Sequence, residues 1–313
     1  MKKCGTDKEV VDSFIEQNEQ DGLRVFVAGG HQAGNNPLYE EEAYNLGRQI
    51  IKMDFKLDFG LSNVGIMGAV ARGVLDGWNK KQCKIKEVPI QAVTTREYYS
   101  LYSQDDELVR QIGNVVLAKT LEERKHKLLL ADFVVFAPGG VGTLDELAYD
   151  CVAMQDGLLP VKPFIIYNID GFFHHLLEFL KSIAAEGFAE PIPFIVVDNS
   201  ADLEVVFRLL KMRYNKNHST AEAYANARQL AYELPYFLKK KTDSSIHVED
   251  IIADMEQIER NGSEEEKHNL TSAIEQAYLE KEIERMYERL AKTGRDTSIV
   301  SDKLTALKKR RKK

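Results

Sequence analysis

The sequence contains little cysteine and has no long hydrophobic run. Its 313 residues include three cysteines, Cys4, Cys83 and Cys151. Because their number is odd and their spacing wide, they predict neither a disulfide framework nor a zinc site, and they are typical of a reducing compartment. The first residues lack the apolar core of a secretory signal, and no segment is long and apolar enough to span a membrane. We therefore expect a cytoplasmic protein with no membrane span and no metal site.

Basic residues are also in the minority. The chain has 42 Lys and Arg against 49 Asp and Glu, which gives a formal net charge of -7. This balance argues against nucleic-acid binding by the body of the protein. The exception is the C-terminal tail, residues 308–313, in which every residue is Lys or Arg. Such a tail docks on acidic lipid or RNA, serves as a localisation signal or is simply a solvated end, and the sequence leaves these alternatives open.

Short apolar runs alternate with amphipathic segments over residues 23–213. The runs predict buried strands at Leu23–Ala28, Leu57–Phe59, Ile90–Val93, Phe133–Ala137, Phe164–Tyr167 and Phe194–Val197. The segments between them predict helices at Tyr39–Lys52, Gly68–Gly77, Leu121–Ala131, Leu144–Gln155, Phe172–Glu186 and Ala201–Met212. Strict alternation predicts an α/β fold, a Rossmann-like doubly wound parallel sheet with helices on both faces. The apolar content of 44% is enough for a substantial core.

The pattern changes after Tyr214. The remaining residues form charged helical segments with breaks near 215–217, 242–245 and 261–263. We expect a helical lead-in over 1–22, an α/β domain over 23–214, a charged helical extension over 215–307 and the basic tail. An apolar stripe from Leu270 to Leu290 shifts phase along the extension, which favours packing on the core or on another helix over a long coiled coil. The extension is therefore interpreted as a packing or oligomerisation element rather than a separate active module.

The segment from Phe133 to Glu146 is the most informative part of the chain. Its first five residues predict a strand covered on both faces, and Pro138 ends that strand. Three glycines follow, at Gly139, Gly140 and Gly142. Without β-carbons, their backbone N–H groups can approach an anion closely, and Thr143 adds a hydroxyl donor. The helix predicted over Leu144–Gln155 directs its positive N-terminal dipole at the same anion. On spacing alone, the alternative is a tight turn before a capped helix.

Two acidic residues fall in the first turn of this predicted helix. Glu146 either offsets the helix dipole or projects toward the group that the phosphate carries, and both uses fit its spacing. Asp145 is expected to be a surface acid that offsets the dipole.

Several motifs resemble those of one family. Pro138–Glu146 matches the pattern Pro-Gly-Gly-x-Gly-Thr-x-x-Glu of the LOG family, the cytokinin-activating phosphoribohydrolases that are often called lysine decarboxylases. Arg124–Lys125 resembles the Arg-Lys signature of that family. Ala28–Tyr39 resembles its first strand-loop, and Gly65–Ala71 resembles its second glycine loop. The resemblance keeps the family's order over residues 23–213, which a chance match of nine residues would not do.

The resemblance implies a nucleotide-binding hydrolase. The enzyme would cleave the N-glycosidic bond of a nucleoside 5′-monophosphate, AMP or a cytokinin riboside monophosphate, into the free base and ribose 5-phosphate. Glu146 and Arg124 would be catalytic. The substrate and its phosphate would be bound by Gly139, Gly140, Gly142, Thr143, Lys125, Gly30 and Met67. The family also implies a homodimer or higher homo-oligomer, and no cofactor is expected. Lysine decarboxylation is poorly supported, because no residue is identifiable as a pyridoxal-phosphate lysine with its pyridinium partner.

Two segments depart from the family pattern. Gly60–Asn63 stands where the family usually has a run of glycines, and Gly30-His31 stands where it usually has serines. Contacts to the base or the ribose are therefore expected to differ. His31 itself is either a ligand contact or an exposed loop histidine.

Two alternative functions stay open. One is a non-catalytic protein of the same superfamily that senses or carries a nucleotide, as molybdenum-cofactor carriers do. The other is a nucleotide nucleosidase of broader specificity. A pure binder would not require Glu146 and Arg124 together, so this pair separates the first alternative from the enzyme.

Overall fold

The computed structural model describes residues 23–80, 87–102, 107–112, 114–189, 192, 194–213, 220–241 and 246–310. The expected lead-in over 1–22, Cys4, Cys83 and the predicted breaks at 215–217 and 242–245 lie outside these residues. The chain divides into two compact units, Met1–Ala227 and Arg228–Lys313, here called the α/β unit and the helical unit. The division falls inside helix α10 (Thr220–Lys240), beyond the change of composition at Tyr214.

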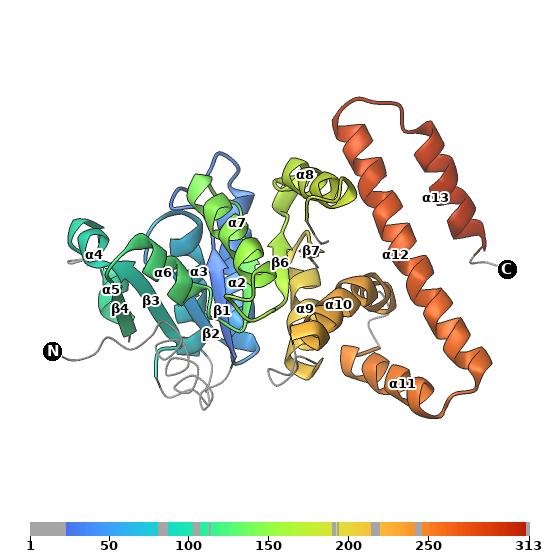
Figure 1. The fold of residues 1–313 in the computed structure, drawn as a ribbon, viewed down its shortest axis with the longest axis horizontal. Coiled ribbons are helices and arrows are strands. Elements are labelled where there is room, and N and C mark those ends of the chain that lie inside the picture. The colour runs from blue at the N-terminus through green and yellow to red at the C-terminus, as the bar shows by residue number, and fades with distance from the viewer. Residues whose placement is uncertain are drawn as a thin grey trace. The chain divides into compact units, whose positions relative to one another are not determined.

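In the described part of the α/β unit, seven strands form one parallel sheet (Figure 1). Their order is β4-β3-β2-β1-β5-β6-β7, and each strand is parallel to its neighbours. The strands are β1 (Arg24–Ala28), β2 (Lys56–Phe59), β3 (Ile90–Thr95), β4 (Asn114–Ala118), β5 (Phe133–Phe136), β6 (Phe164–Tyr167) and β7 (Phe194–Val197). The predicted doubly wound parallel sheet is confirmed, and the six predicted strands are all present.

Strand β4 was not predicted. It lies at the edge of the sheet, and of its five residues only Ala118 is buried. The Asn114 side-chain amide donates to the Gln91 side-chain oxygen on β3 at 2.9 Å. Val115–Ala118 is an apolar run like those of the other strands, so the sequence carried a signal for β4 that the prediction missed, although at the edge of the sheet most of this run is only partly buried.

The strand order reverses at β1. From β1 the chain builds outward through β2, β3 and β4 on one side, and from β5 it builds through β6 and β7 on the other. Ala28 pairs with Phe136, so the last residues of β1 and β5 lie side by side at the carboxyl edge of the sheet. In open α/β sheets, ligands bind outside the carboxyl ends of the strands at such a switch point.

Helices cover both faces of the sheet. They are α2 (Leu38–Lys52), α3 (Gly65–Lys80), α4 (Arg96–Tyr102), α5 (Glu107–Gln111), α6 (Leu121–Leu128), α7 (Val141–Gln155), α8 (His174–Ala185) and α9 (Ser200–Arg213), with a short 3-10 turn η1 (Ile169–Gly171) before α8. Leu128 of α6 and Leu147 of α7 pack in one core cluster with Val134 of β5. On the other side of β5, the Phe133 ring lies 5.7 Å from the Phe207 ring of α9. The alternation of side chains along β5 thus fills a core on each face.

Helix α7 begins earlier than predicted. Its first residue is Val141 rather than Leu144, and Gly140 is its N-cap in an extended conformation, with φ -95° and ψ -156°. Thr143 therefore lies inside the first turn, whereas Asp145 and Glu146 lie in the second turn, not the first as predicted. The glycines permit this early start, because the chain turns directly from the strand into the helix. The helix ends as predicted before Gly157, which has φ 71°.

Helix α8 begins later than predicted, at His174 rather than Phe172. Asp170 and Gly171 both have positive φ, 50° and 73°, so the chain cannot enter an α-helix there. The side-chain oxygen of Asn168 accepts a hydrogen bond from the Phe173 N–H at 2.8 Å and closes the turn. Asp170-Gly171 therefore forms the turn that leads into α8.

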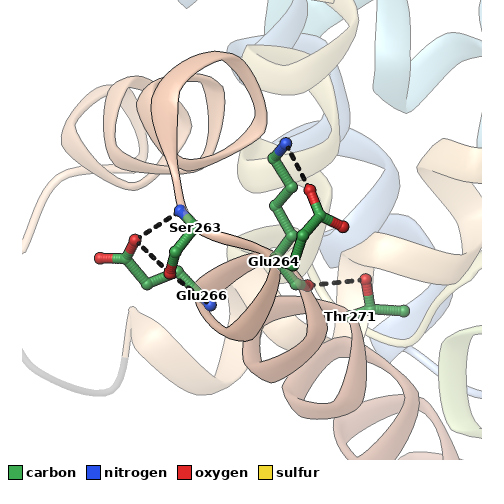
Figure 2. Close-up of polar contacts among 5 residues, drawn as sticks. Ser263, Glu264, Glu266 and Thr271 are labelled. Carbon is green, nitrogen blue, oxygen red and sulfur yellow. Dashed lines mark hydrogen bonds and ion pairs between the residues drawn. The ribbon is translucent and has the colours of Figure 1, made fainter.

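The helical unit consists of the second part of α10 followed by α11 (Val248–Asn261), α12 (Glu264–Lys292) and α13 (Ser298–Arg310). The predicted break at 261–263 is the start of α12. Ser263 accepts from the Glu266 N–H at 3.3 Å, and the Glu266 carboxylate accepts from the Ser263 N–H at 2.8 Å, which makes a capping box (Figure 2). Helix α13 continues to Arg310, so the basic tail begins inside a helix and its last residues, 311–313, lie outside the described ones.

The apolar stripe of α12 keeps a single face. Its buried apolar residues are Leu270, Ile274, Ala277 and Ile283. Leu279 and Met286 are 47% and 39% exposed, so the predicted shift of the stripe to a second phase is wrong. The reason is that a polar residue, Glu280, occupies the buried face, where its carboxylate accepts from the Lys239 ammonium of α10 at 3.1 Å.

Candidate functional site

The loops after β1 and β5 touch each other at the switch point. The Gly30 N–H donates to the Pro138 carbonyl at 2.9 Å. A β-carbon on Gly30 would lie 3.3 Å from the Cα of Gly139, and one on Gly139 would overlap the hydroxyl of Thr143. Gly30 and Gly139 are therefore glycines because the two loops pack closely, and Thr143 is buried beneath them.

Gly140 and Gly142 differ from these packed glycines. A β-carbon at either would meet no atom within 4 Å among the described residues, and neither has a positive φ. Neither packing nor backbone conformation thus requires glycine here. Both residues lie at the N-terminus of α7, which has no side-chain cap among the described residues. Open space above uncapped N–H groups at a helix N-terminus is the arrangement that binds a phosphate.

Arg124 and Glu146 face each other next to this turn. An N-cap begins α6, with Thr120 accepting from the Glu123 N–H at 3.1 Å, and this sets Arg124 in the first turn of the helix. The Arg124 Nη1 lies 3.6 Å from the Glu146 Oε1, and each side chain is 14% exposed. The sequence named both residues, and the structure brings them together from two different helices.

Two main-chain carbonyls hold the Arg124 guanidinium. Its Nε donates to the Val93 carbonyl on β3 and its Nη2 to the Gly60 carbonyl after β2, both at 3.1 Å. A β-carbon on Gly60 would overlap the Nη2 atom, so any other residue there would displace the guanidinium from its present position. Sequence analysis missed both carbonyl partners, and only the glycine directly after a predicted strand was a signal for one of them.

Burial changes the acidity of Glu146. It raises the pKa of this carboxyl from the ordinary value of 4.5 to about 7, and the Arg124 charge opposes the rise. A carboxyl with a pKa near 7 exists in both protonation states at neutral pH, so it can accept and return a proton. The combination of a perturbed carboxyl and a fixed cation in a crevice is typical of an active site.

Lys125 points to a different partner. Its ammonium lies 2.7 Å from the Asp145 carboxylate and 4.8 Å from the centre of the Tyr149 ring. Asp145 was predicted to offset the helix dipole, but it lies in the second turn of α7 and pairs with Lys125 instead. This pair ties α6 to α7. Binding of the ligand by Lys125 stays a prediction.

Met67 and His31 lie beside the same loops. The Met67 N–H donates to the Gly30 carbonyl at 3.3 Å, and its sulfur would lie 3.4 Å from a β-carbon on Gly60. The His31 Nδ1 lies 3.0 Å from the hydroxyl of Ser62, in the loop after β2. The predicted site residues Gly30, Met67 and Arg124 thus meet around the end of β2, although they come from three separate segments.

Neither a metal cluster nor a membrane helix is found in the part of the chain that the structure describes. Within that part, no three or more His, Cys, Asp or Glu side chains are arranged to hold a metal ion. No helix there combines the length and the apolar character needed to cross a bilayer.

Known proteins with similar sequences share this region. A family model described as "Possible lysine decarboxylase" matches residues 67–207. Cytokinin riboside 5'-monophosphate phosphoribohydrolase LOG2 of Arabidopsis thaliana is 26% identical over 198 residues, which cover 63% of this chain and 86% of that protein. Cytokinin riboside 5'-monophosphate phosphoribohydrolase LOG of Oryza sativa subsp. japonica is 29% identical over 188 residues, or 59% of this chain and 72% of that protein.

A solved structure is also similar. The molybdenum cofactor carrier protein of Chlamydomonas reinhardtii matches with a TM-score of 0.44 and 16% identity, over 61% of this chain and 99% of that chain. A likeness at this level says nothing about function. The sequence matches, together with the signature residues placed at the switch point, confirm the predicted resemblance of the α/β unit to the LOG family.

Proposed function

We propose that this protein hydrolyses the N-glycosidic bond of a nucleoside 5′-monophosphate and releases a free base and ribose 5-phosphate. The observation that carries the proposal is the buried Arg124–Glu146 pair, 3.6 Å apart, directly beside an open glycine turn at the switch point. The similar proteins named as cytokinin riboside 5′-monophosphate phosphoribohydrolases support the same reaction. AMP and a cytokinin riboside monophosphate are the proposed substrates.

The chemistry follows from the positions of the two groups. The phosphate is bound by the N–H groups around Gly140 and Gly142 and by the dipole of α7, with C1′ of the ribose near Glu146. Cleavage builds positive charge on the sugar, as in an oxocarbenium-like transition state. The Glu146 carboxylate stabilises that charge more than it stabilises the neutral substrate, and it accepts a proton from the attacking water. Arg124 keeps Glu146 oriented and favours its ionised form.

The test of the reaction is direct. Purified protein is incubated with AMP, isopentenyladenosine monophosphate and adenosine, and the free base and ribose 5-phosphate are quantified. We expect base release from the two monophosphates and little from adenosine, because the phosphate supplies the binding energy that positions C1′. Nucleotide binding without base release would overturn the hydrolase and favour a nucleotide carrier or sensor.

The pH dependence tests the role of Glu146. Because the carboxylate is the active form, kcat/KM is expected to fall about tenfold per pH unit below pH 7 and to level off above it. In Arg124→Gln the opposing cation is lost, so the pKa of Glu146 rises further. The fall of kcat/KM toward acid pH should therefore begin above pH 7 in this variant. A profile that is flat between pH 5 and 8 in the wild type would rule out an essential Glu146 carboxylate.

We also propose that the protein forms a homodimer or a higher homo-oligomer through the outer face of α7. Val141, Leu144 and Val152 lie on one face of this helix and are 83%, 46% and 55% exposed. An apolar face of this kind marks an interaction site. Multi-angle light scattering is expected to find an oligomer for the wild type and a monomer for the double variant Leu144→Glu/Val152→Glu. Phe188→Glu, which changes an equally exposed residue outside α7, is the control and should leave the oligomer intact.

A further inference from the structure

The two helices that carry Arg124 and Glu146 are joined a second time by a buried lysine. Lys162 lies between α7 and β6, and its side chain is buried. Its ammonium donates to the carbonyl of Leu129, the C-cap residue of α6. The same Nζ lies 3.2 Å from the Oδ1 of Asp150, a buried residue of α7. One cation thus contacts the end of α6 and the second half of α7, and these two contacts are here called the Lys162 bridge.

The bridge lies close to the Arg124–Glu146 pair along both helices. Asp150 is four positions after Glu146, so the two carboxyl groups lie on the same side of α7, one turn apart. Leu129 is five positions after Arg124 at the end of α6. Because a helix of this length moves as a rigid rod, a shift of either helix at Lys162 moves Arg124 relative to Glu146.

The other contacts between α6 and α7 fix their spacing less well. Leu128 of α6 and Leu147 of α7 pack in one core cluster, but apolar contacts have no preferred direction. Lys125 and Asp145 form an ion pair at the surface, where the Asp145 side chain is 62% exposed and such a pair contributes little. A buried ammonium between a carbonyl and a carboxylate has a preferred distance to each. The Lys162 bridge is therefore the contact that defines how far apart the two helices lie.

We propose that Lys162 is a positioning residue for the reaction: its bridge between α6 and α7 holds Arg124 and Glu146 in their reactive arrangement. The inference rests on the proposed function, in which Arg124 orients the Glu146 carboxylate. Because its side chain is buried, Lys162 acts through the two helices and not on the substrate. Without the bridge, fewer molecules have the two groups in the arrangement that reacts.

The experiment uses the double variant Asp150→Leu/Lys162→Met of the full chain. This variant removes the bridge but leaves no unpaired buried charge, so we expect it to fold. With AMP as substrate, kcat should fall by about tenfold to a hundredfold, the effect of a small displacement of the reacting groups. KM should change little, because the glycine turn that binds the phosphate is unchanged. A folded double variant with the kcat of the wild type would overturn the inference.

Phe207→Leu is the control that separates positioning from stability. Phe207 is buried in α9, on the face of the sheet opposite to α6 and α7. The smaller side chain leaves a cavity and should lower the free energy of unfolding, as measured in urea, by an amount similar to that in the double variant. Its kcat should nevertheless stay close to that of the wild type. An equal fall of kcat in Phe207→Leu would show that lower stability is the cause, which contradicts a positioning role.

The pKa of Glu146 is a readout that needs no turnover. Burial raises this pKa, and the charge of Arg124 is the strongest influence that opposes the rise. If the bridge keeps Arg124 in place, its removal weakens that attraction, so the pKa should rise above the wild-type value of about 7. Asp145 and Lys125, whose charges also act on Glu146, are unchanged in the double variant. ¹³C NMR of the glutamate carboxyl groups follows the titration, and Glu146→Gln assigns the signal.

Titration and turnover together separate this inference from the proposed reaction. A higher Glu146 pKa in the double variant, with no base release from AMP by the wild type, would support the role of Lys162 in holding the pair and overturn the hydrolase. Base release by the wild type, with a Glu146 pKa that is the same in the double variant, would support the hydrolase. It would overturn the role of Lys162 even if kcat had fallen, because Arg124 would then have kept its place.

Discussion

Replacing Glu146 by glutamine is expected to lower kcat on the order of a thousandfold while nucleotide affinity changes little. Glutamine has the same shape, but it has no charge to stabilise the sugar cation and accepts no proton from water. Arg124 keeps its two carbonyl partners at Gly60 and Val93, so the site stays assembled. The measurements are kcat with AMP and the dissociation constant by calorimetry.

Folding is not expected to complicate the Glu146→Gln result. Burial already disfavours the charged form of this carboxyl, as its pKa of about 7 shows, and a neutral amide avoids that cost. The matched control is Asp145→Asn, which removes the neighbouring acid of the same helix, a side chain that is 62% exposed. Its kcat should stay close to that of the wild type. If Glu146→Gln keeps kcat within tenfold of the wild type, Glu146 is not the catalytic carboxylate.

Replacing Lys162 by methionine is expected to destabilise the protein by about 3–5 kcal/mol, the cost of leaving a buried charge without its partner. Lys162 and Asp150 are 1% and 0% exposed, and the Nζ lies 3.2 Å from the Oδ1. The ammonium also donates to the Leu129 carbonyl, whereas neither Asp150 oxygen has an aligned hydrogen-bond donor among the described residues. Urea unfolding at neutral pH measures the loss.

The pH dependence identifies the cause of that loss. Burial raises the pKa of Asp150 to about 6 even beside Lys162, and removing the cation raises it further. A carboxyl whose pKa is raised on folding costs stability as the pH rises above its unfolded value near 3.8. The free energy of unfolding of Lys162→Met should therefore approach that of the wild type near pH 4. Toward pH 7 it should become lower than that of the wild type. The double variant Asp150→Leu/Lys162→Met should recover most of the stability at pH 7, because no buried charge remains. A loss of stability that is the same at every pH would instead indicate that Lys162→Met acts by disturbing side-chain packing.

The sequence predicted the sheet well because its buried strands are continuous apolar runs. The prediction missed β4, although Val115–Ala118 is an apolar run as well. It also started α7 too late, because glycines in sequence do not reveal that a helix begins among them. The Arg124–Glu146 pair proposed to be catalytic was named only by resemblance. No spacing in the chain predicts that Arg124 reaches Glu146 across two helices, or that carbonyls of β3 and the β2 loop hold it.

His31 illustrates a second limit. In the sequence, this residue and Ser62 are two unrelated departures from a pattern, and each has an unremarkable explanation as a loop residue. Only the parallel pairing of β1 with β2 brings the ends of their loops together, so that the two side chains share a hydrogen bond. Contacts between loops of neighbouring strands depend on sheet order, which single-sequence periodicity does not encode.

The loop after β2 makes contacts through both its main chain and its side chains. The Gly60 carbonyl accepts from the Arg124 guanidinium, and the Ser62 hydroxyl lies 3.0 Å from the Nδ1 of His31. An anchor made of backbone does not change when neighbouring side chains are substituted. Exchanging a side chain of this loop therefore does not remove the carbonyl that holds Arg124.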